Sequence, residues 1–168
     1  METTALLRLD FNNMTAGAIG EHGITEDELE SYLPMAKAAA KAMEEKRPLM
    51  KWRELPHNQG NIVEELKECA EYVRANFDDF VVLGIGGSAL GPIAVQQALN
   101  HLHYNDLPKE KRSGPRLFVE DNVDPERMAA LLDVVDIKRT AFNVVTKSGS
   151  TSETMAQLLI VFDLLKKH

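Results

Sequence analysis

Hydrophobic residues in the first half of the chain recur at the three- and four-residue spacing that is typical of amphipathic helices. One such segment begins after Thr25, and Glu28 stands three residues further on, which is the spacing of a capping box. Pro34 interrupts the pattern and predicts a kink or two abutting helices. A second helix is predicted from Asn61 to Phe77. The expected apolar stripes are Leu29, Leu33, Ala36, Ala40 and Met43 in the first helix, and Ile62, Leu66, Cys69, Val73 and Phe77 in the second.

The segments beside these helices have no sustained hydrophobic period. The segment from Met1 to Gly23 is expected to form an extended or looping arm. The segment from Pro48 to Asn58 contains two prolines and is expected to be a linker. Trp52 and Leu55 are its predicted anchors on the hydrophobic core.

From about residue 80 onward, short apolar runs alternate with helical patterns. The predicted strands are Phe80 to Ile85, Arg116 to Val119 and Ala141 to Val145. Three helices are predicted between and after these strands. The first has its apolar positions from Leu90 to His101, the second begins at Asp124-Pro125, and the third runs from Ser152 to Lys167. This alternation indicates an α/β fold, a three-layer doubly wound parallel sheet. The flavodoxin-type order two-one-three would leave the third strand at an edge.

Two regions follow from this pattern. Residues 1–78 are expected to form an N-terminal arm and helices that pack on the domain, and residues 79–168 an α/β domain. Open α/β sheets usually have more than three strands. We therefore expect the domain to be incomplete at its C-terminal end.

Composition narrows the classes of protein that fit. The net charge of −7 disfavours nucleic-acid binding, which needs clustered Lys and Arg. The single cysteine, Cys69, excludes an internal disulfide and is expected to be buried in the face of a helix. No apolar run is long enough to span a bilayer, and the acidic start does not resemble a signal peptide. Hence we expect no membrane partner and a cytoplasmic location.

The first candidate site is the glycine-rich turn that follows the first strand. The run V-V-L-G-I-G-G-S-A-L-G-P places Gly84, Gly86, Gly87 and Ser88 between a buried strand and a helix. Glycine lets the bare backbone approach a ligand closely. A helix start adds free N–H groups and the positive end of a dipole, so the turn suits an anion.

The second candidate site is the hydroxyl-rich loop T-K-S-G-S-T-S-E-T after the third strand. A phosphate monoester needs several donors in a concave arrangement, which hydroxyls, backbone N–H groups and a lysine supply. The candidate residues are Thr146, Lys147, Ser148, Gly149, Ser150, Thr151 and Thr154. Ser150 and Glu153 also have capping-box spacing, so the alternative is that Ser150 only caps the helix and Lys147 is simply solvated.

A dinucleotide site is the competing interpretation of the glycine turn. Gly84-x-Gly86-x-x-Ala89 satisfies that fingerprint in its alanine form. The fingerprint also requires an acidic residue about 20 positions further on. Glu120 and Asp121 come much later than that, and no lysine of a Walker loop is present. A nicotinamide-dependent dehydrogenase is therefore disfavoured.

Together, G-I-G-G-S-A-L-G-P and T-K-S-G-S-T-S-E-T resemble the sugar-isomerase (SIS) domain, and more narrowly the N-terminal part of the glucose-6-phosphate isomerase family. W-R-E-L-P before the domain resembles bacterial members. The resemblance covers Thr25 to His168. It implies that Gly87 and Ser88 contact the sugar phosphate, that Thr146, Lys147, Ser148 and Thr151 hold its phosphate, and that Thr154 lies nearer the sugar.

The same resemblance implies an activity for the full-length protein. Family members interconvert glucose 6-phosphate and fructose 6-phosphate through an enediol, without a cofactor or metal, and a homodimer is expected. The family's catalytic glutamate, arginine, histidine and lysine lie beyond residue 168, so this chain is expected to bind a hexose 6-phosphate and not to turn it over. The alternative is a stand-alone regulatory SIS module that senses a phosphosugar.

Overall fold

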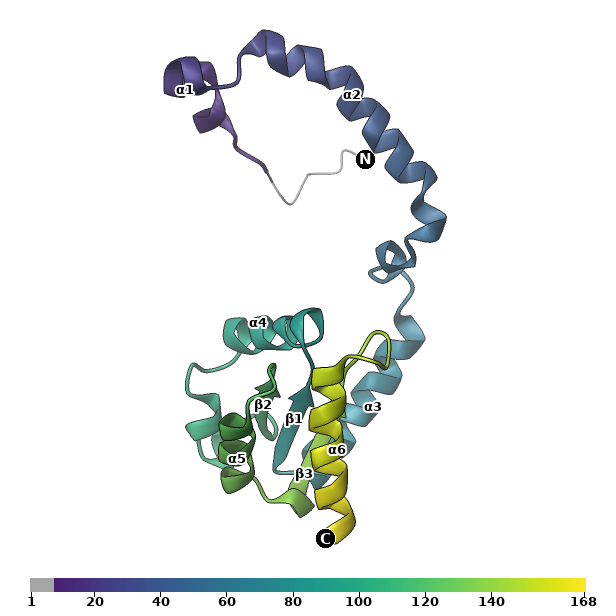
Figure 1. Cartoon of the computed structure of the whole chain (residues 1–168), viewed down its shortest axis with the longest axis vertical. Helices are drawn as coiled ribbons and strands as arrows, with labels where there is room; N and C mark the ends of the chain where they lie inside the picture. Colours follow the sequence, from purple (N-terminus) through teal and green to yellow (C-terminus); the bar gives the residue numbers. More distant parts are fainter. Residues whose placement is uncertain (1–7) are drawn as a thin grey trace. The chain divides into compact units, whose positions relative to one another are not determined.

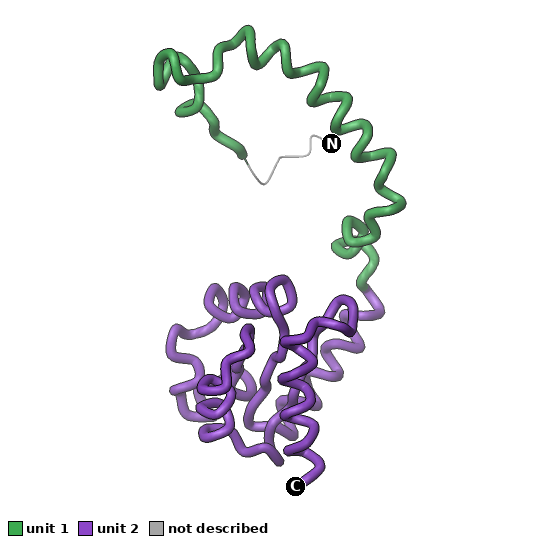
Figure 2. Tube along the Cα trace, viewed as in Figure 1, with its two compact units in different colours: residues 1–59 green, residues 60–168 purple. Residues whose placement is uncertain are grey.

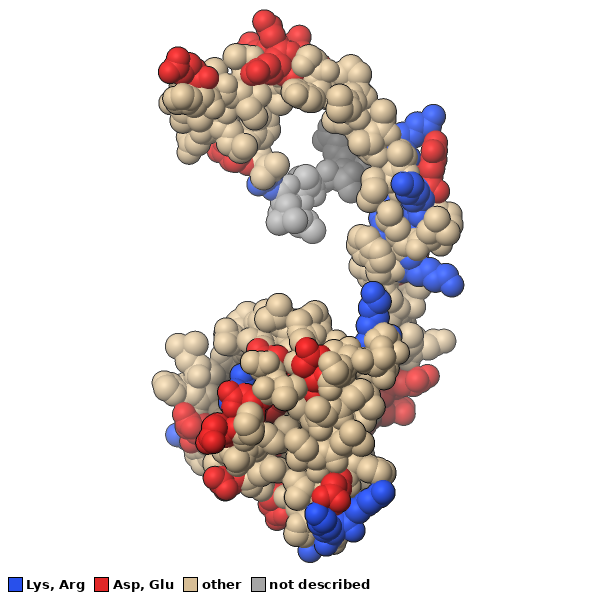
Figure 3. All heavy atoms as spheres, in the orientation of Figure 1, with Lys and Arg blue, Asp and Glu red and all other residues tan. Residues whose placement is uncertain are grey.

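The computed structural model describes residues 8–168, which divide into two compact units at residues 59 and 60 (Figure 1, Figure 2). Residues 1–7 of the predicted arm lie outside the described residues. No described helix is both long enough and apolar enough to cross a membrane. On the displayed face of residues 60–168, acidic and basic side chains are interspersed (Figure 3).

The first unit is helical. Its α-helices are α1 (Ala16–Ile19) and α2 (Glu26–Glu45), and its 3₁₀ turns are Asn12–Met14, Gly20–His22, Arg47–Leu49 and Lys51–Glu54. The arm is thus a series of short helical turns closed by a bridge between Thr15 and Ile24, which sequence periodicity alone did not predict. The predicted capping box is confirmed, because Thr25 accepts from the Glu28 N–H and Glu28 accepts from the Thr25 N–H. A single helix runs through Pro34, so of the two predicted alternatives the abutting helices are wrong and the kink stays a prediction.

The anchoring of Trp52 and Leu55 on the hydrophobic core stays a prediction, because it would join the first unit to the second. Their exposed fractions are 66% and 53% among the described residues. Within the first unit, ion pairs link their segment to the end of α2: Arg47 donates to Glu44 and Glu54, at 2.6 and 2.7 Å. These ion pairs fix the turn without burying its apolar side chains.

The second unit contains one parallel sheet, and the predicted α/β fold and strand order are confirmed. The central strand is β1 (Asp79–Leu83), with β2 (Arg116–Glu120) on one side and β3 (Thr140–Val144) on the other. Leu83 is in register with both Glu120 and Val144, so the three strands end together. Their carboxyl ends therefore form one edge of the sheet. The helices are α3 (Gly60–Asn76), α4 (Leu90–Leu99), α5 (Pro125–Val134) and α6 (Ser152–Lys167).

The hydrophobic core lies on the side of the sheet covered by α5 and α6. Val81 and Leu83 of β1 pack there with Met128, Leu131 and Val161. The start of α5 is as predicted: Pro125 is its first residue, and Asp124 accepts from two N–H groups. Helix α4 ends at Leu99, earlier than predicted, and Asn100 caps it.

On the other side of the sheet, α3 and α4 border an apolar groove of about 610 Å³. Cys69 lines this groove and is exposed, so its predicted burial is wrong. The apolar stripe of α3 exists, but the groove lets solvent reach the cysteine. The apolar pattern of a helix sequence predicts which residues share a face, but it does not predict how closely that face packs on the sheet.

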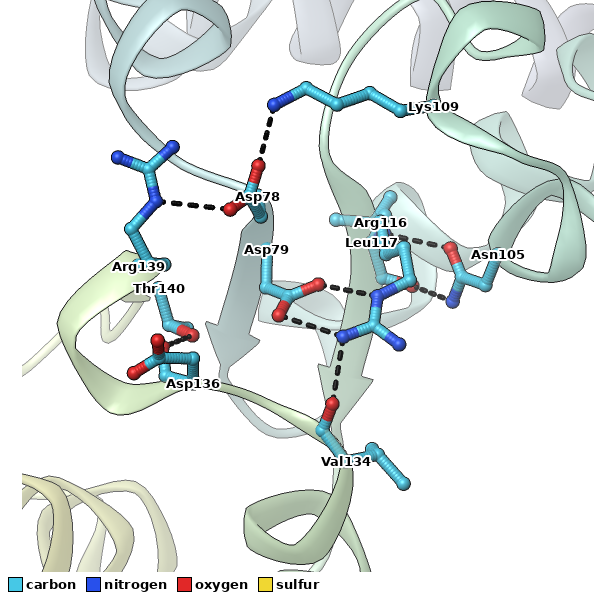
Figure 4. A network of polar contacts seen from close by, with 10 residues as sticks. All are labelled: Asp78, Asp79, Asn105, Lys109, Arg116, Leu117, Val134, Asp136, Arg139 and Thr140. Atoms are coloured by element: carbon cyan, nitrogen blue, oxygen red, sulfur yellow. Dashed lines mark hydrogen bonds and ion pairs between the residues drawn. The ribbon is translucent and has the colours of Figure 1, made fainter.

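The amino ends of the three strands are joined by a polar network (Figure 4). Asp79 is 1% exposed and accepts two hydrogen bonds from Arg116, at 2.6 and 2.9 Å. Arg116 also donates to the Val134 carbonyl at the end of α5. Asp78 accepts from Lys109 at 2.6 Å and from Arg139 at 3.0 Å. The network thus links β1 to the segments that lead into β2 and β3.

This network predicts a pH dependence of stability. Hydrogen bonds from Arg139 and Lys109 lower the pKa of Asp78 from 3.8 to about 2. Because the pKa is lower in the folded state, the ionised Asp78 stabilises the protein at any pH above the ordinary pKa of 3.8. That stabilisation is lost as the pH falls toward 2. We expect Asp78→Asn to cost no more than about 1 kcal/mol at neutral pH, because the pair is partly screened by solvent. The cost should shrink between about pH 4 and about pH 2 in urea unfolding.

Asp133→Asn is the matched control, since Asp133 makes no ion pair among the described residues. It should leave the pH dependence of the free energy of unfolding parallel to that of the unmodified chain. If the loss of unfolding free energy in Asp78→Asn stays constant down to about pH 2, the assigned role of Asp78 is contradicted.

Candidate functional site

The two loops singled out by the sequence leave the sheet from neighbouring strands. One follows β1 and the other follows β3, and these strands are paired so that Leu83 faces Val144. The Val145 N–H donates to the Leu83 carbonyl at 2.9 Å, which extends the pairing to the start of the second loop. Both loops therefore begin at adjacent points on the carboxyl edge of the sheet (Figure 1). Ligands of open α/β folds bind at this edge.

The helices that follow these loops lack side-chain caps. Helix α4 begins after Ala89 and helix α6 after Thr151, and neither preceding residue makes a capping hydrogen bond. By contrast, α2 and α5 are capped by Thr25 and Asp124. The first N–H groups of a helix have no partner within it, so an uncapped start leaves them for solvent or a ligand. The uncapped starts of α4 and α6 both follow the candidate loops.

The glycine loop depends on close packing at its base. A Cβ added to Gly84 would lie 2.9 Å from the Cβ of Ser88 and 3.1 Å from its carbonyl oxygen. Gly86 has a φ of +55°, a left-handed conformation that glycine adopts without strain. Gly86 and Gly87 are exposed, and their N–H groups have no recorded hydrogen bond among the described residues. The loop therefore presents bare backbone donors.

The hydroxyl loop folds on its own side chains. Gly149 has a φ of +72°, and its N–H donates to the Thr146 hydroxyl at 3.2 Å. The Thr146 and Thr151 hydroxyl oxygens lie 3.4 Å apart, and those of Ser148 and Ser150 lie 2.9 Å apart. These pairs bring four donors into one short turn. Lys147 is exposed and makes no ion pair among the described residues.

The start of α6 differs from the prediction. Thr151 occupies the N-cap position instead of Ser150, and the predicted capping box between Ser150 and Glu153 is absent. Glu153 accepts a hydrogen bond from the Ser152 hydroxyl at 3.0 Å. The left-handed Gly149 turns the chain so that Ser150 pairs with Ser148 inside the loop. The interpretation of Ser150 as only a cap therefore fails.

Thr154 is placed differently from the other candidates. Its side chain is 1% exposed, whereas Lys147, Ser148, Gly149 and Ser150 are all exposed. It lies in the first turn of α6, on the side that faces the interior. Its assignment next to the sugar stays a prediction from the resemblance.

Two buried polar residues border the site at the end of β2. Glu120 is buried, and burial raises the pKa of its carboxyl, while Arg127 at 3.2 Å opposes that shift. Gln157 of α6 donates to the Asn122 carbonyl at 2.9 Å, which links α6 to the segment after β2. Gln157 was not among the residues predicted from the sequence. The available signal was a polar residue on the same helix face as Val161.

This arrangement can hold a small anion. It offers backbone N–H groups, several hydroxyls and one exposed cation at adjacent strand ends. Hydrogen bonds from such groups to a charged acceptor are stronger than those to a neutral one. No described group of three or more His, Cys, Asp or Glu side chains is arranged to hold a metal ion.

Comparison with known proteins finds relatives of a single family. The family model described as phosphoglucose isomerase matches residues 59–168. Glucose-6-phosphate isomerase of Carboxydothermus hydrogenoformans is 46% identical over 163 residues, covering 96% of this chain and 35% of that protein. The enzyme of the same name from Rubrobacter xylanophilus is 45% identical over 142 residues, covering 84% of this chain and 32% of that protein. The chain thus spans about a third of the length of these relatives.

Solved structures show the same likeness. A hypothetical protein from Thermus thermophilus has a TM-score of 0.64 and 36% identity, covering 84% of this chain and 32% of that one. A glucose-6-phosphate isomerase from Chlamydia trachomatis has a TM-score of 0.50 and 34% identity, covering 62% of this chain and 19% of that one. The fold of this chain is therefore shared with these solved structures.

Proposed function

Because the chain belongs to the phosphoglucose isomerase family, we propose that its two loops bind the phosphate group of a hexose 6-phosphate. The observation that carries this proposal is the pair of uncapped helix starts at the ends of adjacent strands. A phosphate dianion placed there would meet free N–H groups from both helices and the favourable ends of both dipoles.

Each loop has its own part in the proposed binding. Gly87 and Ser88 approach the sugar phosphate from the glycine loop, with bare N–H groups at Gly86 and Gly87. The hydroxyl loop surrounds the phosphate with the side chains of Thr146, Ser148, Ser150 and Thr151, the backbone of Gly149 and the charge of Lys147. The hydroxyl pairs of this loop would break and turn their hydrogens toward the phosphate oxygens. Ligand binding thus replaces weak internal hydrogen bonds with charge-assisted ones.

The proposed reaction of the full-length protein is the interconversion of glucose 6-phosphate and fructose 6-phosphate. Moving a proton between C2 and C1 needs a base beside the bound sugar. Within this chain, Glu120 is buried against Arg127 and Glu153 accepts from Ser152, so neither is a free base at the loops. The proposal for this chain is therefore binding without turnover, and for the full-length protein an isomerase that acts as a homodimer in the cytoplasm.

Titration with fructose 6-phosphate tests the binding site. We expect saturable shifts of the Gly86, Gly87, Ser148 and Thr151 amide signals in nuclear magnetic resonance spectra. Ser148→Ala removes one hydrogen bond to a charged group, which is worth about 1.5–3 kcal/mol. Affinity should therefore fall by about tenfold or more. NAD at the same concentration should leave these signals unchanged.

Ser31→Ala is the control variant, because the Ser31 hydroxyl donates only to the Glu28 carbonyl within α2. It should bind the sugar phosphate as tightly as the unmodified chain. The absence of shifts at millimolar sugar phosphate would reject the assigned site. Isomerase activity from the purified chain would instead reject the conclusion that a base is lacking.

A further inference from the structure

A small cationic pocket lies at the amino edge of the sheet, opposite the two loops. It has a volume of about 150 Å³ and borders the residues that lead into β1 and β2. We call it the arginine pocket. Its polar lining consists of Arg74, Asp78, Lys109, Arg112, Ser113 and Gly114.

Arg112 is the unusual member of this lining. Its Nε and Nη1 atoms are buried and have no hydrogen-bond partner among the described residues. Each other arginine in residues 60–168 has a carboxylate partner. A buried charged group without a partner is unfavourable, because it loses the hydrogen bonds that water would give it. Such a group calls for a ligand, an ion or a water molecule.

The neighbouring carboxylate, Asp78, makes no hydrogen bond or ion pair with Arg112 among the described residues. Asp78 already accepts from Lys109 at 2.6 Å and from Arg139 at 3.0 Å (Figure 4). Arg74, on the other side of the pocket, is paired with Glu71 at 2.6 Å. The lining therefore holds three cations and one carboxylate, in a chain whose net charge is −7. This local excess of positive charge favours an anionic ligand.

Gly114 and Ser113 form the backbone wall of the pocket. A Cβ added to Gly114 would lie 3.5 Å from the Cγ of Arg74 and 3.7 Å from its Nε, so Arg74 covers this glycine. The Ser113 hydroxyl lies 3.3 Å from the Tyr104 hydroxyl and is a further donor at the pocket. A guanidinium presents its N–H groups as a planar fork that matches two oxygens of a phosphate or carboxylate.

We propose that the arginine pocket is a second anion site, in which the Arg112 guanidinium binds a phosphate or carboxylate group. The site is separate from the two loops, because it borders the opposite edge of the same sheet. The oxyanion comes either from free phosphate or from an acidic side chain of another polypeptide segment. Both sources share the recognition chemistry, and two probes distinguish them.

The test follows the Arg112 Nε–H signal of the whole chain in nuclear magnetic resonance spectra during titration with inorganic phosphate and, separately, with acetate. We expect saturable shifts of this signal and of the Gly114 amide at millimolar concentration. A response to phosphate alone identifies free phosphate as the ligand, and an equal response to acetate identifies a carboxylate. Either response supports the site. No saturable response to either probe overturns the proposal.

Variants separate this site from the sugar-phosphate site. Arg112→Gln should weaken the Gly114 response to phosphate at least tenfold, while the Ser148 response to fructose 6-phosphate stays unchanged. Lys111→Gln, which removes an exposed neighbouring charge outside the pocket, is the control and should change neither response. If Arg112→Gln fails to fold, Arg112→Lys keeps the charge without the fork and should show the same tenfold loss. A Gly114 response that survives in the folded Arg112 variant overturns the proposal.

Discussion

Replacing Asp79 with alanine is expected to lower the free energy of unfolding by about 3 kcal/mol. Asp79 is almost fully buried at the start of the central strand and holds the Arg116 guanidinium through two hydrogen bonds. Its removal leaves that charge with only the Val134 carbonyl as a partner. We take the lower end of the range for broken buried pairs, because the Arg116 side chain is 29% exposed and water can reach it. Urea unfolding followed by circular dichroism measures the change.

Two comparisons make this prediction specific. Glu64→Ala breaks an exposed ion pair with Lys67 and should cost less than about 1 kcal/mol. The double variant Asp79→Leu with Arg116→Leu removes both buried charges and should be more stable than Asp79→Ala alone. Equal losses of unfolding free energy for Asp79→Ala and Glu64→Ala would show that the buried pair stabilises the fold no more than the exposed one.

Replacing Gly84 with alanine is expected to damage both stability and binding. The new Cβ would lie 2.9 Å from the Cβ of Ser88 and within 3.2 Å of its backbone, so the loop must move. Overpacking of this kind typically costs about 1–3 kcal/mol of unfolding free energy. The displaced loop carries the N–H groups of Gly86 and Gly87, so the affinity for fructose 6-phosphate should fall by about tenfold or more. Urea unfolding and amide-shift titration measure the two effects.

Gly60→Ala is the matched control for this variant. Gly60 is the first residue of α3, and a Cβ added there meets no atom within 4 Å. It should leave affinity unchanged. If Gly84→Ala binds fructose 6-phosphate as tightly as Gly60→Ala, the close packing of Gly84 against Ser88 does not hold the binding loop in place.

The candidate site could be predicted to a large extent because its parts are local. A glycine cluster between a strand and a helix and a run of hydroxyls after a later strand are both visible as strings of letters. The strand order then brought the two loops to adjacent strands, as predicted. The exact cap of α6 could not be predicted, because it depends on the left-handed turn at Gly149 and on the pairing of Ser148 with Ser150.

The sequence by itself determined the succession of helices and strands, the starts of α2 and α5, and the parallel sheet. These features follow from backbone preferences and from the period of apolar residues, which act over a few positions. Only the tertiary structure decided that Cys69 is exposed, that Asp79 is paired with Arg116, and that two guanidinium nitrogens of Arg112 are buried without a partner among the described residues. Burial and ion pairing depend on contacts between segments that are far apart in the sequence. The spacing of residues within one segment does not predict those contacts.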